Sequence, residues 1–320
     1  MKIVFHGANA LTFFEGFETL LETPHDLVTV SDTLDGEGEL AHYQTAQVIV
    51  GTHSRAEHPP TSAKLFQLPA AGYDGVHFPS LPEGCAVCNC FGHENAIAEY
   101  VMAALLARHV PVAEADRQLR GGDWHYWAGG PSGLRTELGA QSIGIVGHGH
   151  IGRTLAARAL AFGMTVHVAN RSPVSATDYA ATYGLADLAE MASRVDVLIN
   201  TLPLSDGTAG IIGADVLNAL GPRSIVMNVG RGPVIDEDAL FEVLSTRKIG
   251  GAIIDTWYVY PTPGQPNPMP GHKPFHELDN VTLTPHMSGW TNGTISRRQK
   301  AMASNIDRLA RGERLQNPVA

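Results

Sequence analysis

Cysteine, clustered basic charge and long apolar runs are all scarce in this chain of 320 residues. No stretch approaches the roughly 18 uncharged apolar residues that span a bilayer. Residues 1–16 contain no small-residue cleavage site of the kind that ends a signal peptide. We therefore expect a cytoplasmic protein that has no membrane partner.

Basic residues are also outnumbered. The chain has 22 Lys and Arg residues against 32 Asp and Glu residues, for a formal net charge of −10 at pH 7, and no segment concentrates the basic ones. Proteins that bind nucleic acid do so through clustered Lys and Arg, whereas an acidic surface by itself serves mainly solubility. We therefore expect no nucleic-acid partner.

The three cysteines, Cys85, Cys88 and Cys90, lie together in CAVCNC. A structural zinc site needs four ligands, and no second Cys or His pair follows at a suitable spacing. Cys88 and Cys90 are too close in sequence for an easy disulfide. His148 and His150 have no third ligand nearby in the sequence. The sequence therefore predicts reduced, partly buried thiols, as in cytoplasmic proteins, and no metal site.

What the chain does contain is a repeated alternation of short apolar segments with helical patterns. Most apolar segments end in Gly, Pro or a small polar residue, as strands of parallel sheets do. Strands that alternate with helices imply right-handed crossovers and doubly wound parallel sheets. The expected strands are KIVFHG (2–7), DLVTVS (26–31), QVIVGT (47–52), KLFQLPA (64–70) and CAVCNC (85–90) in a first series, and SIGIVG (142–147), TVHVAN (165–170), VDVLINT (195–201), SIVMNVG (224–230), GAIIDTW (251–257) and NVTLTP (280–285) in a second.

Longer helical patterns lie between and after these two series. One runs over residues 94–120, and Pro111 is expected to interrupt it. The Gly- and Trp-rich residues 121–140 are expected to form a loop or an arm. A last amphipathic helix within residues 291–313 has no strand after it, so we expect it to pack back on the first domain.

In SIGIVGHGHIGRTLA, three glycines form a GxGxxG pattern directly after an apolar strand and at the start of a helix. This strand–turn–helix context is what a dinucleotide-binding loop requires. The glycines let the backbone turn tightly and approach a pyrophosphate, which then lies at the positive end of the helix dipole. The predicted cofactor-binding loop is Gly147, His148, Gly149, His150, Ile151 and Gly152.

The next strand ends in VHVANRSP, which places Asn170 where NAD-selective proteins carry an Asp or Glu for the ribose 2′-hydroxyl. A carboxylate would repel the additional phosphate of NADP, whereas Arg171, followed by Ser172, can bind it through charge-assisted hydrogen bonds. The sequence therefore favours NADP(H) over NAD(H). In the alternative, Arg171 stacks on the adenine and both cofactors bind.

Several ordered segments resemble the D-isomer-specific 2-hydroxyacid dehydrogenases, the family that includes phosphoglycerate, formate and hydroxypyruvate/glyoxylate enzymes. The resemblance covers most of the chain from about residue 69 onward, and the first sixty residues add only a compatible α/β pattern. The segments are LPAAGYDGV (68–76), GHENAIAEYV (92–101), GIVGHGHIG (144–152), VDVLINTLPLSDGTAGII (195–212), SIVMNVGRGPVIDEDAL (224–240), GGAIIDTW (250–257) and LTPHMSG (283–289).

The resemblance implies a role for each matching residue. Arg231 grips the substrate carboxylate and polarises the carbonyl to be reduced, a task that suits a planar bidentate donor. His286 is the general acid and base, because an ordinary imidazole pKa of about 6.5 suits proton exchange at neutral pH. Asp255 orients the nicotinamide carboxamide or, in the alternative, only caps a loop. Further cofactor contacts are implied for Thr201, Pro203, Val229, Ser288 and Gly289, and substrate contacts for Ala71, Gly72 and His93.

The chain departs from the family pattern five residues after Asp255. Family members usually carry a Glu there, sometimes a Gln, paired with the histidine, whereas this chain has Tyr260. A carboxylate beside His286 raises the imidazole pKa, and a neutral phenol does not. Tyr260 can still hydrogen-bond to the ring and fix its tautomer; alternatively, Glu277 or Asp279 supplies a carboxylate. We predict a lower catalytic pKa than that of a Glu–His pair.

Residues 260–275 contain six prolines, so we expect a stiff, irregular wall or lid rather than a flexible linker. Trp257 and Tyr258 stand just before this segment. They either enclose a substrate pocket or pack at the domain junction.

Together these features predict a Rossmann dinucleotide-binding domain over residues 94–289 and a flavodoxin-like substrate domain over residues 1–93 and 290–320, with a cleft between them. The family resemblance implies an NAD(P)-dependent oxidoreductase that transfers a hydride between nicotinamide and a small 2-oxo or 2-hydroxy acid, similar to glyoxylate/hydroxypyruvate reductases. Residues 121–140 resemble the segment with which family members clasp a twofold partner, so we expect a homodimer. The alternative function is a non-catalytic, dinucleotide-sensing regulator of the same fold, although the chain has no long disordered tail for recruiting partners.

Overall fold

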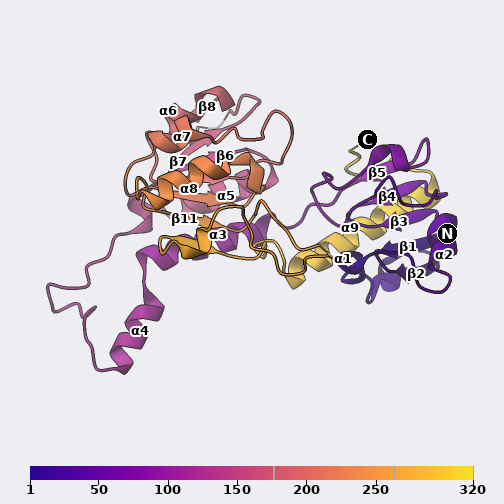
Figure 1. The fold of residues 1–320 in the computed structure, drawn as a ribbon, viewed down its shortest axis with the longest axis horizontal. Helices are drawn as coiled ribbons and strands as arrows, with labels where there is room; N and C mark the ends of the chain where they lie inside the picture. The colour runs from indigo at the N-terminus through magenta and orange to yellow at the C-terminus, as the bar shows by residue number, and fades with distance from the viewer. Residues whose placement is uncertain (176, 263, 320) are drawn as a thin grey trace. The chain divides into compact units, whose positions relative to one another are not determined.

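The computed structural model describes residues 1–175, 177–262 and 264–319, and it divides the chain into two compact units. Unit 1 comprises Met1–His93 with Trp290–Ala320, and unit 2 comprises Glu94–Gly289. Each unit is built on its own parallel β-sheet with helices against it (Figure 1). Each also has hydrophobic clusters of its own.

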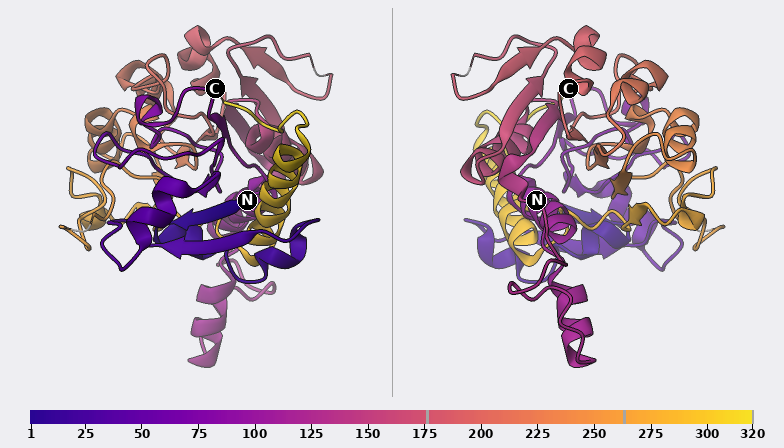
Figure 2. Two further views of the ribbon diagram at one scale, coloured as in Figure 1. Left: turned by 90° about the vertical axis from the view of Figure 1, so that its right-hand side faces the viewer. Right: turned by 90° about the vertical axis from the view of Figure 1, so that its left-hand side faces the viewer.

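Unit 1 contains a five-stranded parallel sheet in the order β2-β1-β3-β4-β5. This is the flavodoxin-like strand order. The apolar strand β1 is buried from both sides, because Phe5 packs against Met302 and Ile306 of α9, while Val4 packs in a cluster with Tyr43 of α2. Figure 2 shows α9 running along this sheet. The elements are β1 (Lys2–His6), α1 (Ala8–Leu11), η1 (Phe17–Leu20), β2 (Asp26–Val30), α2 (Glu39–Thr45), β3 (Val48–Val50), β4 (Leu65–Gln67), η2 (Phe78–Ser80), β5 (Ala86–Cys88) and α9 (Asn292–Arg311).

Unit 2 contains a seven-stranded parallel sheet in the order β12-β11-β10-β9-β6-β7-β8. The chain builds outward from β6 to β8 and then restarts at β9 on the other side of β6, so the winding direction reverses between β6 and β9. The elements are α3 (Glu94–His109), α4 (Val112–Arg120), η3 (Leu138–Ala140), β6 (Ser142–Val146), α5 (His150–Ala161), β7 (Thr165–Ala169), β8 (Ala181–Tyr183), η4 (Leu185–Asp187), α6 (Leu188–Ala192), β9 (Val197–Asn200), α7 (Ala214–Ala219), β10 (Ile225–Asn228), η5 (Gly232–Val234), α8 (Glu237–Ser245), β11 (Gly251–Ile254), η6 (Phe275–Glu277) and β12 (Val281–Leu283).

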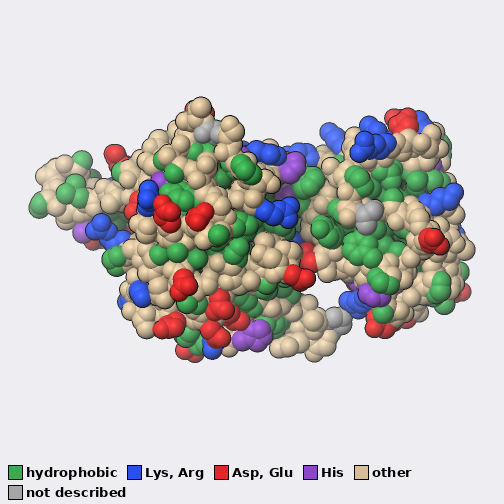
Figure 3. All heavy atoms as spheres, turned by 90° about the horizontal axis from the view of Figure 1, so that it is seen from above, with side chains coloured by type: hydrophobic (Ala, Val, Ile, Leu, Met, Phe, Trp, Pro, Cys, Tyr) green, Lys and Arg blue, Asp and Glu red, His purple; other side chains and the backbone are tan. Residues whose placement is uncertain are grey.

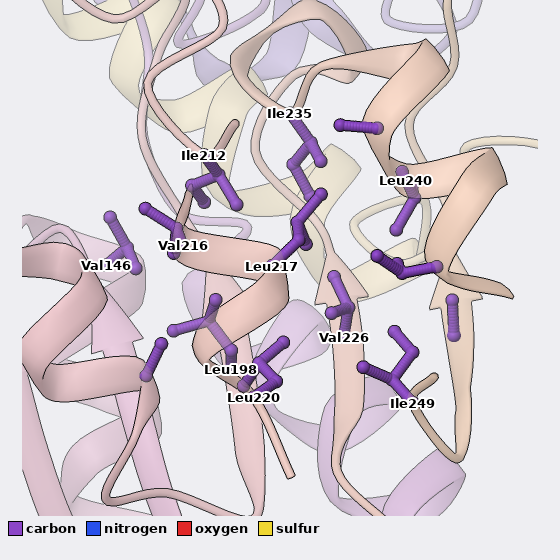
Figure 4. Packing of buried hydrophobic residues seen from close by; sticks show 14 of the residues in the cluster. Val146, Leu198, Ile212, Val216, Leu217, Leu220, Val226, Ile235, Leu240 and Ile249 are labelled. Carbon is purple, nitrogen blue, oxygen red and sulfur yellow. The ribbon is translucent and has the colours of Figure 1, made fainter. Parts of the chain in front are cut away.

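The central strands of unit 2 are continuous apolar runs because helices cover both faces of the sheet. On one face, Leu217 of α7 and Leu240 of α8 pack over Leu198 of β9 and Val226 of β10 (Figure 4). On the other face, α3 and α5 cover the sheet through a second apolar cluster. The predicted fold class, two parallel-sheet α/β domains, is confirmed.

The predicted helix over residues 94–120 is two helices. Between α3 and α4 the chain bends by 47°, and Pro111, which cannot donate a backbone hydrogen bond, lies at the break. Helix α4 has no buried residue, and with the loop after it extends away from the sheet of unit 2 (Figures 1 and 2). Among the described residues, no helix alone has the length and apolar composition to cross a membrane; only α3 and α4 counted together, across their bend, reach both.

Two further predictions concern local segments. The three cysteines are free thiols, and burial raises the pKa of Cys88 to about 11 and that of Cys90 to about 12. In the Pro-rich segment 260–275, the N–H groups of Tyr258 and Val259 just before it donate to the carbonyl of Pro270 within it. Pro263 of that segment lies outside the described residues.

Candidate active site

The side chains singled out in the second half of the sequence follow adjacent strands of the unit 2 sheet. Arg231 follows β10, Asp255 and Tyr260 follow β11, and His286 follows β12, and these three strands are hydrogen-bonded neighbours. The glycine turn follows β6 at the point where the winding reverses. Carboxyl ends of parallel strands share one edge, and ligands bind there in open α/β sheets.

Each of the three glycines of the turn is suited to its position for a different structural reason. Gly147 has a φ of +102°, and a Cβ there would lie 2.7 Å from the Thr201 hydroxyl. A Cβ on Gly152 would collide with the carbonyl oxygen of Gly147, so helix α5 can approach the turn only without a side chain there. At Gly149, by contrast, no atom of the described residues lies within 4 Å of an added Cβ. These are the tight turn, the close packing and the open approach that a pyrophosphate site needs.

Polar side chains hold this turn from two sides. The Thr201 hydroxyl contacts the carbonyls of Val146 and Gly147 at 3.0 and 3.1 Å. On the other side, the N–H of His148 donates to the Asn170 side-chain oxygen at 3.2 Å, and the His148 ring lies 2.9 Å from the Tyr179 hydroxyl. Burial, followed by the charge of Arg153, lowers the pKa of His148, so its ring is neutral at physiological pH.

The end of β7 carries no carboxylate. The Asn170 side chain is used internally, because its oxygen accepts from the glycine turn and its amide donates to the Ser172 carbonyl at 3.0 Å. Arg171 and Ser172, directly after it, are exposed. A site with an exposed guanidinium and no acidic group at this strand end can accept an anionic substituent on the ribose.

Two buried amides shape the backbone around Arg231, and neither belongs to the residues that the sequence singled out. Asn200 and Asn228 end the adjacent strands β9 and β10, are 0% and 1% exposed, and are joined by a 2.8 Å hydrogen bond. The Asn228 amide donates to the Arg231 carbonyl at 3.1 Å. The only signal in the sequence is an Asn that ends each of two apolar strands, VLIN and IVMN.

Arg231 itself is half-buried and extended, and its guanidinium donates to the Gly230 carbonyl at 3.0 Å. The next residue is Gly232, and a Cβ there would collide with the carbonyl of Trp257. The segments after β10 and β11 are therefore in direct backbone contact. Val229, just before, is 4% exposed with its side chain in the apolar core, so only its backbone is available to a ligand.

Asp255 organises the loop that carries His286. Its fully buried carboxylate accepts from the Thr284 hydroxyl at 2.6 Å and from the N–H groups of Met287 and Ser288 at 2.9 Å each. Both carboxylate oxygens are thus bonded within the loop, as in the loop-capping alternative drawn from the sequence. Ser288 is 5% exposed.

His286 is held in an unusual backbone conformation next to a phenol. Its φ of +55° lies in the left-handed region that few non-glycine residues adopt, and such outliers concentrate at functional sites. Nδ1 of its exposed ring lies 2.8 Å from Oη of Tyr260, which also accepts from the Trp257 N–H at 3.1 Å. Of the two alternative carboxylates, Asp279 pairs with Arg247, and Glu277 lies on η6 with Oε1 3.9 Å from Nε2 of the adjacent His276.

A phenol can serve both protonation states of the imidazole. With His286 neutral, the Tyr260 O–H can donate to Nδ1 and keep the proton on Nε2; with His286 charged, Nδ1–H can donate to the phenol oxygen. The pair can therefore hold one ring orientation while Nε2 gains or loses a proton. This is the chemistry required of a general acid and base.

Trp257 and Tyr258 are packing residues of unit 2. Trp257 is 4% exposed, packs in the apolar cluster and donates from Nε1 to the Thr284 carbonyl at 2.7 Å. Tyr258 stacks on Phe275 and donates to the Ile235 carbonyl at 3.0 Å. Both side chains therefore pack within unit 2, and a role for them at a substrate pocket or at the domain junction stays a prediction.

The remaining predicted contacts are spread over both units. His150 and Ile151 are the first residues of α5, directly after the glycine turn, and Pro203 and Gly289 lie in the segments after β9 and β12. In unit 1, Ala71 and Gly72 are half-buried in the segment after β4, where the Asn89 amide donates to the Ala71 carbonyl at 2.7 Å. His93 is buried at the end of the first part of unit 1.

A reversing parallel sheet whose edge carries an open glycine turn and a hydrogen-bonded imidazole is typical of nicotinamide-dependent oxidoreductases. Comparison with known proteins agrees. The family model described as "D-isomer specific 2-hydroxyacid dehydrogenase, NAD binding domain" matches residues 102–288. The chain is 32% identical to the hydroxyphenylpyruvate reductase of Plectranthus scutellarioides over 223 residues. This alignment covers 70% of this chain and 67% of that protein.

Similar relatives and structures extend the match to the whole chain. Glyoxylate/hydroxypyruvate reductase A of Arabidopsis thaliana is 31% identical over 227 residues, covering 70% of this chain and 67% of the relative. The NADPH-dependent glyoxylate/hydroxypyruvate reductase of Sinorhizobium meliloti, solved with NADP and malonate, superimposes with a TM-score of 0.78 at 26% identity, covering 99% of this chain and 96% of that one.

The chain belongs to the family of D-isomer specific 2-hydroxyacid dehydrogenases. The predicted class, an NAD(P)-dependent 2-hydroxyacid dehydrogenase, is confirmed, and the sensing alternative is not favoured.

Proposed function

We propose that this chain reduces small 2-oxo acids of the glyoxylate and hydroxypyruvate type to 2-hydroxy acids, with NADPH as the preferred reductant. The observation that carries the proposal is the 2.8 Å contact between Tyr260 and His286 at the sheet edge that also carries the open glycine turn. A reduced nicotinamide bound at that edge supplies the hydride. The chain itself supplies charge and a proton.

In this proposal, Arg231 binds the substrate carboxylate and stabilises the negative charge that develops on the C2 oxygen. His286 donates a proton from Nε2 to that oxygen, while Tyr260 holds Nδ1 and so the orientation of the ring. Asp255 keeps the His286 loop in place through its hydrogen bonds to residues 284–288. Asn228 positions the backbone of Arg231.

A test of the substrate class and of Arg231 is NADPH oxidation with glyoxylate, hydroxypyruvate and longer 2-oxo acids. We expect turnover with the small acids and, for Arg231→Ala, a loss on the order of 100- to 1,000-fold in kcat, as when a preorganised charge-stabilising donor is removed. Arg231→Lys should restore charge but not the bidentate geometry and so remain well below wild type. Near-full turnover of Arg231→Ala would remove Arg231 from the mechanism.

The preference for NADPH is supported by the absence of a carboxylate at the end of β7 and by the exposed Arg171. We expect Arg171→Ala to raise the KM for NADPH by about tenfold, equivalent to the loss of one charge-assisted contact of about 1.4 kcal/mol, and to leave the KM for NADH nearly unchanged. Arg223→Ala is the matched control, because Arg223 is exposed and precedes β10 at the opposite end of the strands. An equal rise of the KM for NADPH and for NADH in Arg171→Ala would contradict the assignment of Arg171 to the additional phosphate of NADPH.

We further propose that the protein acts as a homodimer in the cytoplasm. The free buried thiols are consistent with a reducing compartment. Helix α4 and the loop after it expose Val112, Trp124, Trp127 and Leu134, at 67%, 65%, 59% and 92%, and Figure 3 shows hydrophobic side chains on this projecting loop, at the left of the view. A second copy of the chain would cover these side chains.

A further inference from the structure

Three histidines of unit 1, one from β1 and two from the segment after β3, meet at the carboxyl end of its sheet. His6 is the last residue of β1, His53 follows β3, and His58 lies in the loop beyond it. One ring nitrogen from each lies within 4.8 Å of the others. The ring centroids are 5.4 Å apart for His6 and His53, 5.0 Å for His6 and His58, and 5.7 Å for His53 and His58. Because β1 and β3 are hydrogen-bonded neighbours, the sheet holds the first two side by side.

The His6 ring is buried in an environment that is unusual for a polar side chain. Its side chain is 1% exposed, and neither ring nitrogen has a hydrogen-bond partner among the described residues. Nε2 of His53 is likewise buried without a hydrogen bond within the described part of the chain. A buried polar group left unsatisfied costs about 1–3 kcal/mol, and the His6 ring is therefore a group that a bound ion would satisfy.

A carboxylate borders the three rings. Asp32 follows β2, the strand on the other side of β1, and its Oδ1 lies 3.6 Å from Nε2 of His53. The N–H of Ala8 donates to its Oδ2 at 3.1 Å. Gly7, directly after His6, has a φ of +85°, and a Cβ there would collide with the Asp32 carboxylate. The glycine is therefore what lets this carboxylate approach the histidines.

We propose that His6, His53 and His58 form a binding site for a divalent transition-metal ion, zinc above all, with the Asp32 carboxylate beside it. Three imidazoles and one open position are a donor set that zinc accepts, and the negative charge of Asp32 offsets that of the ion. Around a tetrahedral zinc with bonds of about 2.0–2.1 Å, neighbouring nitrogens lie about 3.3 Å apart. His53 and His58 are only half-buried, so their side chains can rotate inward to that spacing.

A further feature suits an ion. A pocket of about 340 Å³, lined by His58, Pro60, Ser80 and Leu81 among others, borders the cluster at His58. The half-buried His58 side chain is therefore the member of the cluster next to this pocket.

The test is metal binding by the full chain, purified without a polyhistidine tag and stripped with a chelator. We expect one Co²⁺ or Zn²⁺ per chain by elemental mass spectrometry, and visible d–d absorption of the Co²⁺ form that reports nitrogen ligation. Zn²⁺ should also raise the Tm, because a ligand that binds only the folded state stabilises it.

The variants His53→Gln and His58→Gln should each weaken Co²⁺ binding at least tenfold and abolish the rise in Tm. Both replace half-buried side chains and leave His6 in the core. His77→Gln is the matched control, because His77 is an exposed histidine of the same unit outside the cluster. Absence of a stoichiometric ion in the unmodified chain, or binding by both cluster variants as strong as that of His77→Gln, would overturn the proposal. The unmodified chain alone is decisive even if a variant folds poorly.

Discussion

Tyr260 stands beside His286 in the place where relatives usually have a carboxylate, and its effect is testable with pH. Tyr260→Glu puts a negative charge next to the ring, which stabilises the imidazolium and raises its pKa. Reduction needs the protonated ring, so activity falls as pH rises through that pKa. The basic limb of the pH profile of kcat/KM should therefore move to higher pH in Tyr260→Glu.

The companion variant Tyr260→Phe removes the hydrogen bonds to His286 Nδ1 and from the Trp257 N–H. We expect kcat/KM to fall about tenfold, or about 1.4 kcal/mol, with little movement of the basic limb, since no charge is added. An unchanged limb in Tyr260→Glu would mean that another group titrates. An unchanged rate in Tyr260→Phe would show that the phenol does not position the ring.

Asn228 is a second residue whose role is testable by substitution. Asn228→Ala removes the oxygen that accepts from the Asn200 amide and from the Gly230 N–H, and the amide that donates to the Arg231 carbonyl; a buried group that loses its partner without replacement costs about 1–3 kcal/mol. Urea unfolding should show a loss of that size, and the KM for the 2-oxo acid should rise because the Arg231 turn loosens. Asn218→Ala, at an exposed position on α7, is the control and should be neutral. Equal stability of the two variants would contradict this role.

At the scale of secondary-structure elements, the roles of two glycines in the β6–turn–α5 unit can be tested separately. Gly152→Ala should destabilise the fold, because its Cβ meets the Gly147 carbonyl, whereas Gly149→Ala meets no described atom. We therefore expect a lowered Tm for Gly152→Ala only. Cofactor binding, measured by nicotinamide fluorescence, should weaken in both, since a methyl group at Gly149 occupies the space through which a pyrophosphate approaches. Full affinity in Gly149→Ala would argue that the pyrophosphate lies elsewhere.

The strands were the elements that the sequence predicted best, because each buried parallel strand is a short apolar run with a clear end. β8 was missed. It covers only three residues, Ala181–Tyr183, at the edge of the sheet and has no buried side chain, so no apolar pattern marks it. The break at Pro111 was predictable, because a proline removes a backbone donor wherever it stands.

The contacts around the site were less predictable than the strands. The sequence indicated that Tyr260 could bond to His286, because the family motif aligns the two positions. The Asn200–Asn228 pair depends on the register between β9 and β10, which no local pattern encodes. The cluster of His6, His53 and His58 has the same cause, because His6 belongs to β1 and the other two to the segment after β3, and the pairing of β1 with β3 brings them together.

At the scale of the whole molecule, α4 is the helix whose stability is not explained by packing within unit 2. It has nine residues and no buried side chain, and a helix shorter than about 12–15 residues is marginal in water without a packing partner. The loop after it exposes Trp124 and Leu134. A single exposed Leu is ordinary, but a short helix and its loop with several large exposed apolar side chains need a surface to cover them.

The homodimer proposal predicts that this surface is the corresponding segment of a second copy. Light scattering coupled to size exclusion should give twice the chain mass for the unmodified protein, and a concentration-dependent shift toward the monomer for the double variant Trp124→Ser/Leu134→Ser. Leu40→Ser is the control, because Leu40 is 47% exposed on α2 of unit 1 and should leave the dimer intact. A monomeric unmodified protein, or a double variant that dimerises as tightly as the control, would show that α4 and its loop are covered in some other way. Because α4 directly follows α3, whose Val101 and Leu105 pack in the core against the sheet, loss of the dimer should also lower the Tm in a concentration-dependent manner.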